Sequence, residues 1–259
     1  MTDSCILVSV VRDFRMYEKC VQGNPFVSDC TKHPIDNRPE NNAISLCYNK
    51  FLDAFDYTRP AWFVFCHEDF QMKEPLLPHL STLCPQKIYG PIGAVTRRRF
   101  GWYYQWQLVG QVQESSKNGS RTRTVGQTSS RPEDSVADTL DCQCLIVHSS
   151  LVRDCALRFD ENLTFDLYTE DFCIQAREKF NIPTLIVPLH CQHWSKGTIA
   201  ERYDVQLDYL RRKWPDVAYT GTAAQLIGGG GSPLWKAEVA LKRAVQRIVR
   251  KLNSLPYAR

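Results

Sequence analysis

The stretch Ala61-Trp-Phe-Val-Phe-Cys66, which runs directly into His67-Glu68-Asp69, decides the fold. Six apolar residues in a row are typical of a strand buried on both faces, as in a parallel sheet covered by helices. Similar runs occur at residues 5–11 (CILVSVV) and 184–188 (TLIVP), and segments with helical spacing of apolar residues lie between them. This alternation predicts an α/β fold with a mainly parallel sheet flanked by helices.

Composition and charge exclude several classes of protein. The chain has 259 residues, 43% of them hydrophobic, which argues against a chain that is disordered throughout. Its formal net charge of +4 is too small to indicate a nucleic-acid-binding protein, and no apolar run approaches the roughly 20 residues that cross a bilayer. The eleven cysteines include no Cys-x-x-Cys pair, which favours free thiols in a reducing compartment over disulfides. We therefore expect a soluble, cytoplasmic protein.

Three short segments carry residues suited to chemistry. His67-Glu68-Asp69 follows a buried strand, and carboxylates at a strand end suit a Mn²⁺ or Mg²⁺ ion bound to a diphosphate. Glu170 and Asp171 lie at the predicted start of a helix, and His193 follows the apolar run at 184–188. Each segment alone also fits a plain structural role: a solvated loop, an acidic helix start or a structural histidine.

The ordered set of motifs resembles family 2 inverting glycosyltransferases of the GT-A fold, in a bacterial subgroup that has His-x-Asp in place of Asp-x-Asp. The resemblance covers residues 5–200. The matching segments, in chain order, are Ile35-Asp36-Asn37, Asn42 with Tyr48-Asn49, Phe65-x-His67-Glu68-Asp69, Tyr89-Gly-Pro-Ile-Gly93-Ala94, Leu140-Asp141-Cys142, Thr169-Glu170-Asp171 and His193-x-Ser195-x-Gly197.

This resemblance implies a hexosyltransferase of polysaccharide biosynthesis that transfers a sugar from a nucleotide-diphosphate sugar to a saccharide or lipid-linked saccharide acceptor. It implies that Asp69 and His193 hold Mn²⁺ or Mg²⁺ at the diphosphate. It also implies that Asp171, with Glu170 as the other member of the pair, is the base that deprotonates the acceptor. The residues that it implies for donor binding are Val11, Arg12, Asp36, Asn49, His67, Glu68 and Asp141.

The chain divides into a catalytic domain, a linker and a basic C-terminal helix. The helix has an apolar stripe with cations on its other faces, which fits either peripheral attachment to an anionic membrane surface or packing on the domain or a second subunit. The GGGGS string before it is either a native hinge or an engineered linker. The expected boundaries are 1–215 for the domain (a nucleotide-sugar half, 1–100, and an acceptor half, 101–215), 216–232 for the linker and 233–259 for the helix.

Other functions remain open at this point. An inactive nucleotide- or sugar-binding relative would not need both Asp69 and Asp171. A nucleotidyltransferase would normally carry a glycine-rich basic loop after the first strand, where this chain has Val11-Arg12-Asp13-Phe14. Arg97-Arg98-Arg99 with nearby aromatic residues such as Trp106 could stack bases, but aromatic residues equally line saccharide sites, and we expect no nucleic-acid partner. Residues 114–135, rich in Ser, Thr, Gly and Arg, predict either a lid or a passive exposed ribbon.

Overall fold

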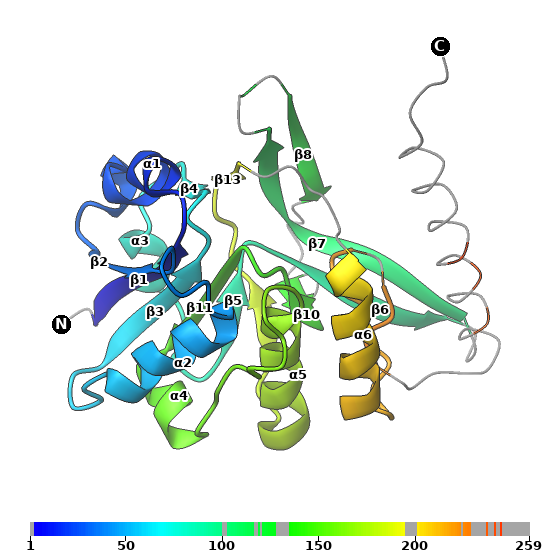
Figure 1. Cartoon of the computed structure of the whole chain (residues 1–259). Coiled ribbons are helices and arrows are strands. Elements are labelled where there is room, and N and C mark those ends of the chain that lie inside the picture. The colour runs from blue at the N-terminus through cyan, green and yellow to red at the C-terminus, as the bar shows by residue number, and fades with distance from the viewer. Residues whose placement is uncertain are drawn as a thin grey trace, which may run out of the picture.

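The computed structural model describes residues 3–99, 103–116, 119, 121–127, 135–194, 201–223 and 225–228, and the single positions 237, 241 and 244. These residues form two β-sheets and the helices that flank them (Figure 1). The α/β class that the sequence predicts is therefore confirmed. The predicted C-terminal helix lies outside the described residues apart from the three single positions, and so do Ser195 and Gly197.

The larger sheet is mixed. Its seven strands among the described residues are, in spatial order, β2 (Thr31–Asp36), β1 (Ser4–Val11), β3 (Ala61–Cys66), β11 (Cys144–His148), β5 (Ile88–Gly90), β12 (Thr184–Ile186) and β9 (Val136–Ala137). The pairs β2–β1, β1–β3 and β5–β12 are parallel, whereas β11 and β9 run antiparallel to their neighbours. The expected parallel arrangement is thus found around β1 and between β5 and β12, whereas β11, which follows a short turn at residues 141–143 instead of a crossover helix, runs antiparallel.

A second sheet, which the sequence did not predict, packs beside the first. Its strands are β10 (Thr139–Leu140), β6 (Ile92–Arg99), β7 (Tyr103–Ser115), β13 (Cys191–His193) and β4 (Phe70–Met72), with β8 (Thr122–Gln127) paired to β7. Residues 122–127 of the predicted loop therefore form a ribbon strand. Whether this ribbon acts as a lid when a ligand binds stays a prediction.

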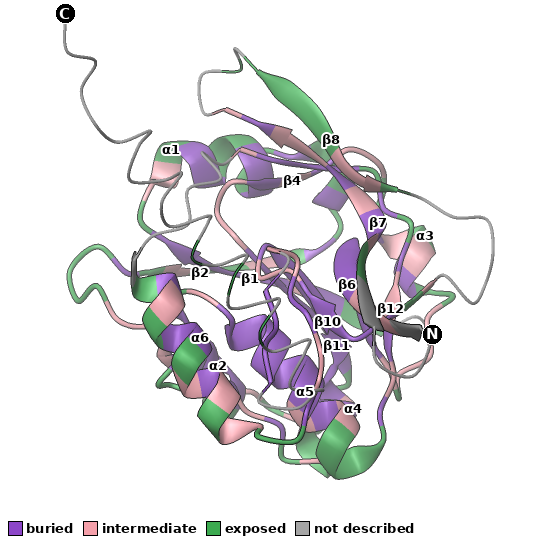
Figure 2. Ribbon diagram, turned by 90° about the vertical axis from the view of Figure 1, so that its right-hand side faces the viewer, coloured by how far each residue is buried: buried purple, intermediate pink, exposed green. Residues whose placement is uncertain are grey.

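Helices cover both faces of the larger sheet. On one face lie α2 (Ile44–Ala54), α4 (Ser149–Asp154), α5 (Tyr168–Phe180) and α6 (Glu201–Lys213), and on the other α1 (Phe14–Tyr17), η1 (Glu18–Gln22), η2 (Pro25–Val27) and α3 (Leu77–Leu80). Phe63 and Phe65 pack into the first face and Trp62 and Val64 into the second, so β3 is buried on both sides. This double burial is why its sequence is continuously apolar. Figure 2 shows the same layering, with buried strands inside and exposed surface on the outer sides of helices such as α2 and α6.

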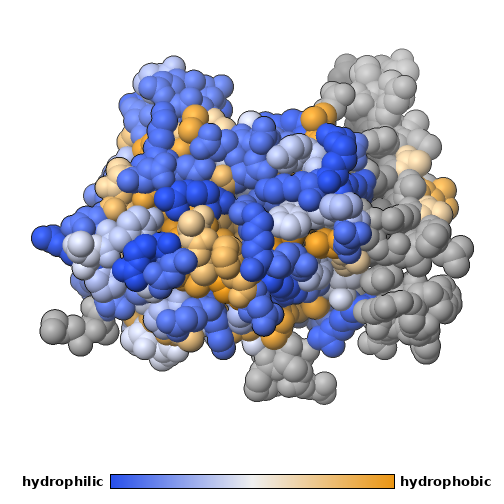
Figure 3. Space-filling view, turned by 90° about the horizontal axis from the view of Figure 1, so that it is seen from below, coloured by the Kyte–Doolittle hydropathy of each residue, from blue (hydrophilic) through white to orange (hydrophobic). Residues whose placement is uncertain are grey.

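The outer surface agrees with this layered core. Seen from below, it is mostly hydrophilic, with hydrophobic surface in separate patches (Figure 3). Among the described residues no helix combines the length and the apolar character that a membrane span requires. The eleven cysteines are all free thiols, and most of them are buried.

The parallel strands end together at one edge of the larger sheet. Val11, the last residue of β1, lies in register with Asp36, the last residue of β2. β3 runs parallel to β1 on its other side, and His67 follows its end directly. Ligands of α/β sheets bind beyond the carboxyl ends of strands, so this edge is where the candidate residues have to be sought.

Candidate active site

The turn after β3 positions His67 and Asp69. The His67 N–H donates to the Gln143 carbonyl at 3.1 Å, and the Phe70 N–H donates to the His67 carbonyl at 3.1 Å, which closes the turn. The chain then enters β4, which pairs antiparallel with β13 so that Phe70 lies opposite His193. This strand pairing brings His193 next to Asp69 from a distant part of the sequence.

His67, Asp69 and His193 form a potential metal site, called here the His-Asp-His cluster. Their candidate ligand atoms all lie within 4.8 Å of one another, and Asp69 Oδ1 is 3.2 Å from His193 Nε2. His193 Nδ1 is buried and has no hydrogen-bond partner among the described residues, so this nitrogen is a polar atom that a ligand could satisfy. Two imidazoles and a carboxylate suit a transition ion such as Mn²⁺ better than Mg²⁺, which prefers oxygen ligands. The residues present therefore fit a divalent cation.

The pKa values of the two histidines of the cluster are shifted in opposite directions. Burial and the neighbouring His193 lower the pKa of His67 to about 4, although Asp69 and Asp141 act in the opposite direction. Burial also lowers the pKa of His193, but its hydrogen bond to Asp69 and the negative charges of Asp69 and Asp141 outweigh burial and leave this pKa above its ordinary value. His67 is therefore neutral at pH 7, which is the form that a metal ligand requires.

Glu68 is tied to the loop that follows β1. Its Oε2 atom accepts hydrogen bonds from the backbone N–H groups of Arg12, at 2.5 Å, and Asp13, at 2.8 Å. Glu68 therefore fixes this loop next to the end of β1. The structure thus brings the predicted donor-binding residues Val11, Arg12 and Glu68 to one edge, beside the His-Asp-His cluster.

Asp36 is paired rather than open at the end of β2. Arg38 donates to both of its carboxylate oxygens, at 2.9 and 2.6 Å, and the Arg38 guanidinium lies 4.4 Å above the ring of Phe14. The hydrogen bonds from Arg38 lower the pKa of Asp36. Sequence reasoning missed Phe14 and Arg38, because a single aromatic residue and a single arginine in a loop carry no pattern that indicates stacking.

Asn49 is a predicted donor-binding residue that the structure does not bring to this edge. Its side-chain amide donates to the Phe159 carbonyl and to Glu161, both at 2.9 Å, and its carbonyl oxygen accepts from the Phe159 N–H at 3.0 Å. The side chain is buried, and its donors and its acceptor are used in joining α2 to the loop before α5. Asn49 thus holds two elements together, and its expected part in donor binding stays a prediction.

Glu170 occupies a buried, negatively charged environment at the start of α5. It is 4% exposed, and its Oε2 atom accepts a hydrogen bond from the Cys142 thiol at 3.1 Å. Burial, followed by the nearby charge of Asp141, raises its pKa to about 8. A carboxyl group with such a pKa is suited to take up a proton near neutral pH.

Asp171, the next residue, points into a different environment. It is fully buried and accepts hydrogen bonds from Lys213 Nζ, Trp214 Nε1 and Gln175 Nε2, each at 2.8 Å. Lys213 also contacts Asp160 at 2.6 Å. Asp171 therefore anchors α6 to α5. Of the two carboxylates that the sequence offers as base, the geometry favours Glu170.

We expect Lys213→Met to destabilise the fold by about 3–5 kcal/mol, because it leaves the buried Asp171 carboxylate without its cation. Urea unfolding of the variant and the wild type measures the difference. Lys50→Met is the matched control, since the side chains of Lys50 and its partner Glu40 are mostly exposed and 3.8 Å apart. Equal effects of the two substitutions would contradict an anchoring role for Asp171.

A segment around Gly221 lies over Asp141 and Glu170. The Thr222 hydroxyl donates to Asp141 Oδ2 at 2.6 Å, and a Cβ atom placed on Gly221 would lie 3.4 Å from Glu170 Oε1. The Gly221 carbonyl accepts the indole N–H of Trp106 at 3.0 Å. Trp106 is 37% exposed, so its side chain is only partly covered next to this segment.

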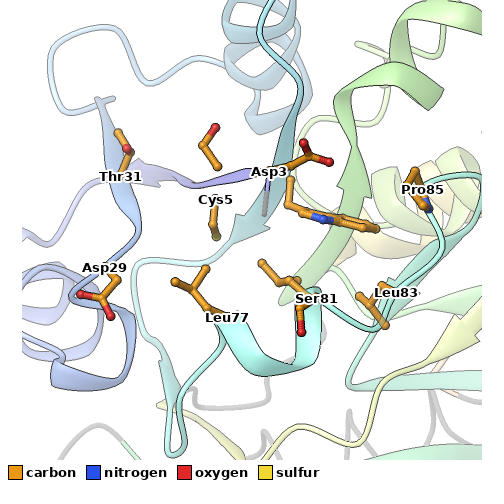
Figure 4. Close-up of a pocket in the computed structure, with 11 residues that line it drawn as sticks. Asp3, Cys5, Asp29, Thr31, Leu77, Ser81, Leu83 and Pro85 are labelled. Atoms are coloured by element: carbon orange, nitrogen blue, oxygen red, sulfur yellow. The ribbon is translucent and has the colours of Figure 1, made fainter. Parts of the chain in front are cut away.

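A pocket at the opposite end of the parallel strands is separate from this site. It has a volume of about 390 Å³ and is lined by Asp3, Cys5, Asp29, Trp62 and Leu77, among others (Figure 4). Some of its residues stand at the amino ends of β1, β2 and β3, and the others belong to α3 and the segment that follows it. None of the predicted site residues lines it.

Comparisons with known proteins give little beyond this geometry. No protein-family model matches the chain, and no curated protein matches it in sequence. The structure is similar to one described as "Crystal structure of GalNAc-T7 with UDP, GalNAc and Mn2+", with a TM-score of 0.47 and 8% identity over 82% of this chain. The match covers 48% of that protein, so this chain spans about half of its length. A similarity of this size carries no argument about what the present chain binds.

Proposed function

We propose that the chain is a metal-dependent glycosyltransferase that inverts the configuration of the sugar it transfers from a nucleotide-diphosphate donor. The observation that carries the proposal is the His-Asp-His cluster at the carboxyl ends of parallel strands, with the buried Glu170 carboxylate nearby. Non-haem iron sites use the same donor atoms. The position at the strand ends and the nearby Glu170 carboxylate distinguish this site from non-haem iron sites. An inactive relative would have no need of such a base.

Donor binding is assigned to the edge formed by β1, β2 and β3. The nucleotide base lies near Val11, Arg12 and Asp36, where the ionised Asp36 carboxylate accepts a hydrogen bond from the base. His67, Asp69 and His193 hold the cation, which neutralises the leaving diphosphate when bound. The donor atoms favour Mn²⁺ over Mg²⁺.

Glu170 is assigned as the general base. A single displacement requires one base to remove the proton of the acceptor hydroxyl as that oxygen attacks the anomeric carbon. The negative charge of Asp141 acts on Glu170 and on both cluster histidines, so Asp141 lies near both the base and the cluster. Trp106 offers an aromatic face for the acceptor sugar ring.

The transfer rate is expected to rise with pH through about 8. Glu170 acts as base only when ionised, and its raised pKa keeps it mostly protonated at pH 7, so activity is lost as pH falls. Asp141, Asp166 and Cys142 are the groups that act on the pKa of Glu170. The pH profile of kcat/KM measures this, and a profile that is flat between pH 6.5 and 8.5 would contradict the assignment.

A panel of nucleotide-sugar donors tests the proposed function. The protein is incubated with each donor and Mn²⁺, and release of nucleoside diphosphate is measured with and without a chelator. Metal-dependent release from one donor supports the proposal and identifies that donor. No release from any donor, together with no binding of nucleoside diphosphates in the presence of Mn²⁺, would overturn it.

The acceptor and the membrane contact rest on the sequence alone. A lipid-linked saccharide would be reached if the basic helix at 233–259 lay on an anionic membrane surface. We expect flotation of the protein with vesicles that contain anionic lipid, no flotation with neutral vesicles, and loss of flotation when residues 228–259 are deleted. Absence of flotation with both kinds of vesicle would refute this part.

A further inference from the structure

A series of hydrogen bonds leads away from the His-Asp-His cluster to Glu170. His67 Nε2 lies 2.9 Å from the Tyr168 hydroxyl. The Tyr168 hydroxyl donates to the Cys142 carbonyl, also at 2.9 Å. The Cys142 thiol in turn donates to Glu170. Tyr168 precedes Thr169-Glu170-Asp171 in the sequence, but a tyrosine at the start of a helix indicates no chemistry by itself.

The hydrogen bonds of Tyr168 determine which ring nitrogen of His67 carries the proton. A tyrosine hydroxyl carries one proton, and a backbone carbonyl can only accept. Because the Tyr168 hydroxyl donates its proton to the Cys142 carbonyl, the Tyr168 oxygen can only accept a hydrogen bond from His67. His67 Nε2 must therefore carry the ring proton. In the neutral imidazole, the Nδ1 atom is then left with its lone pair.

The Tyr168 hydroxyl cannot easily turn to another partner. The residue is 1% exposed, and its ring packs against Tyr48, with centroids 6.0 Å apart, and against Phe159, with centroids 5.9 Å apart. A ring held in this way keeps its oxygen between His67 and Cys142. The hydrogen bond is therefore a fixed feature of the site.

We propose that Tyr168 is a positioning residue, which accepts the Nε2 proton of His67 and so presents Nδ1 of that ring to the metal ion. The inference rests on the proposed function in that His67 is taken as a metal ligand. Partners of this kind orient ligating histidines and raise their affinity for metal. Through Cys142, the same hydroxyl joins the cluster to Glu170.

Mn²⁺ titration of the whole chain, without any donor, tests the inference. Tyr168→Phe is expected to weaken Mn²⁺ binding by roughly 10–100-fold, the usual effect of losing such a partner. Tyr17→Phe is the matched control, since Tyr17 is also buried but its hydroxyl has no hydrogen-bond partner among the described residues. Equal affinities of wild type and Tyr168→Phe would overturn the inference. If the wild type itself binds no Mn²⁺, the proposed function fails first.

The tautomer of His67 gives a second readout that does not depend on the variant or on metal. The chain has six histidines, and ¹⁵N-histidine labelling distinguishes protonated from unprotonated ring nitrogens, with His67→Gln identifying the signals of His67. We expect the Nε2–H form in the metal-free wild type and a mixture of tautomers in Tyr168→Phe. An Nδ1–H form of His67 in the wild type would overturn the inference even if Tyr168→Phe did not fold.

Discussion

Replacing Asp69 by Asn is expected to lower sugar transfer by roughly 10³-fold. A bound cation would contribute several kcal/mol to stabilising the leaving group, and the substitution removes the only carboxylate among the three clustered residues that would hold it. Nucleotide binding should weaken only when Mn²⁺ is present. Isothermal titration with nucleoside diphosphate, with and without Mn²⁺, and a transfer assay measure the two effects.

Asp29→Asn is the control for this substitution. Asp29 lines the pocket at the amino ends of the same strands, so the same chemical change is made at the opposite end of the sheet. We expect wild-type transfer from this variant. If Asp69→Asn also kept near-normal transfer, the cluster would not be the catalytic metal site.

Replacing Glu170 by Gln is expected to lower transfer by roughly 10²–10⁴-fold while donor and Mn²⁺ binding persist. Glutamine keeps the size of the side chain but cannot take up the acceptor proton. Steady-state transfer and titration with Mn²⁺ and nucleoside diphosphate separate the two effects.

Asp171→Asn is the informative comparison for Glu170→Gln. Because Asp171 is bonded to Lys213 and Trp214, its substitution should lower the free energy of unfolding and leave the chemistry of the folded protein largely intact. If Glu170→Gln transferred sugar at the normal rate, and Asp171→Asn were stably folded but had no transfer activity, the assignment of the base would be reversed.

Much of the fold could be predicted from the sequence where burial imposes a pattern. β1 and β3 are read directly, because strands buried on both faces are continuously apolar. The second sheet was missed because the hairpin of β6 and β7 is joined into a sheet by β10, β13 and β4, which come from distant segments. The three arginines at the end of β6 and the glutamines of β7 also hide the strand signal of this hairpin.

The candidate site shows the same division. Asp69 and His193 were predicted as ligands from the motif order, and their proximity arises from the pairing of β4 with β13. The resemblance implied Asp171 as the base, whereas the structure places Glu170 in the environment that suits a base; successive residues of a helix point about 100° apart, and the sequence does not say which direction faces the cleft. The role of Tyr168 depends on a contact with His67 that no local pattern encodes.

Anomalous diffraction from crystals soaked with Mn²⁺ tests the central claim most directly. We predict a manganese peak within coordination distance of the side chains of His67, Asp69 and His193, with His67 approached at Nδ1. A peak elsewhere on the protein, or no peak under conditions in which Mn²⁺ supports donor cleavage, would contradict the account.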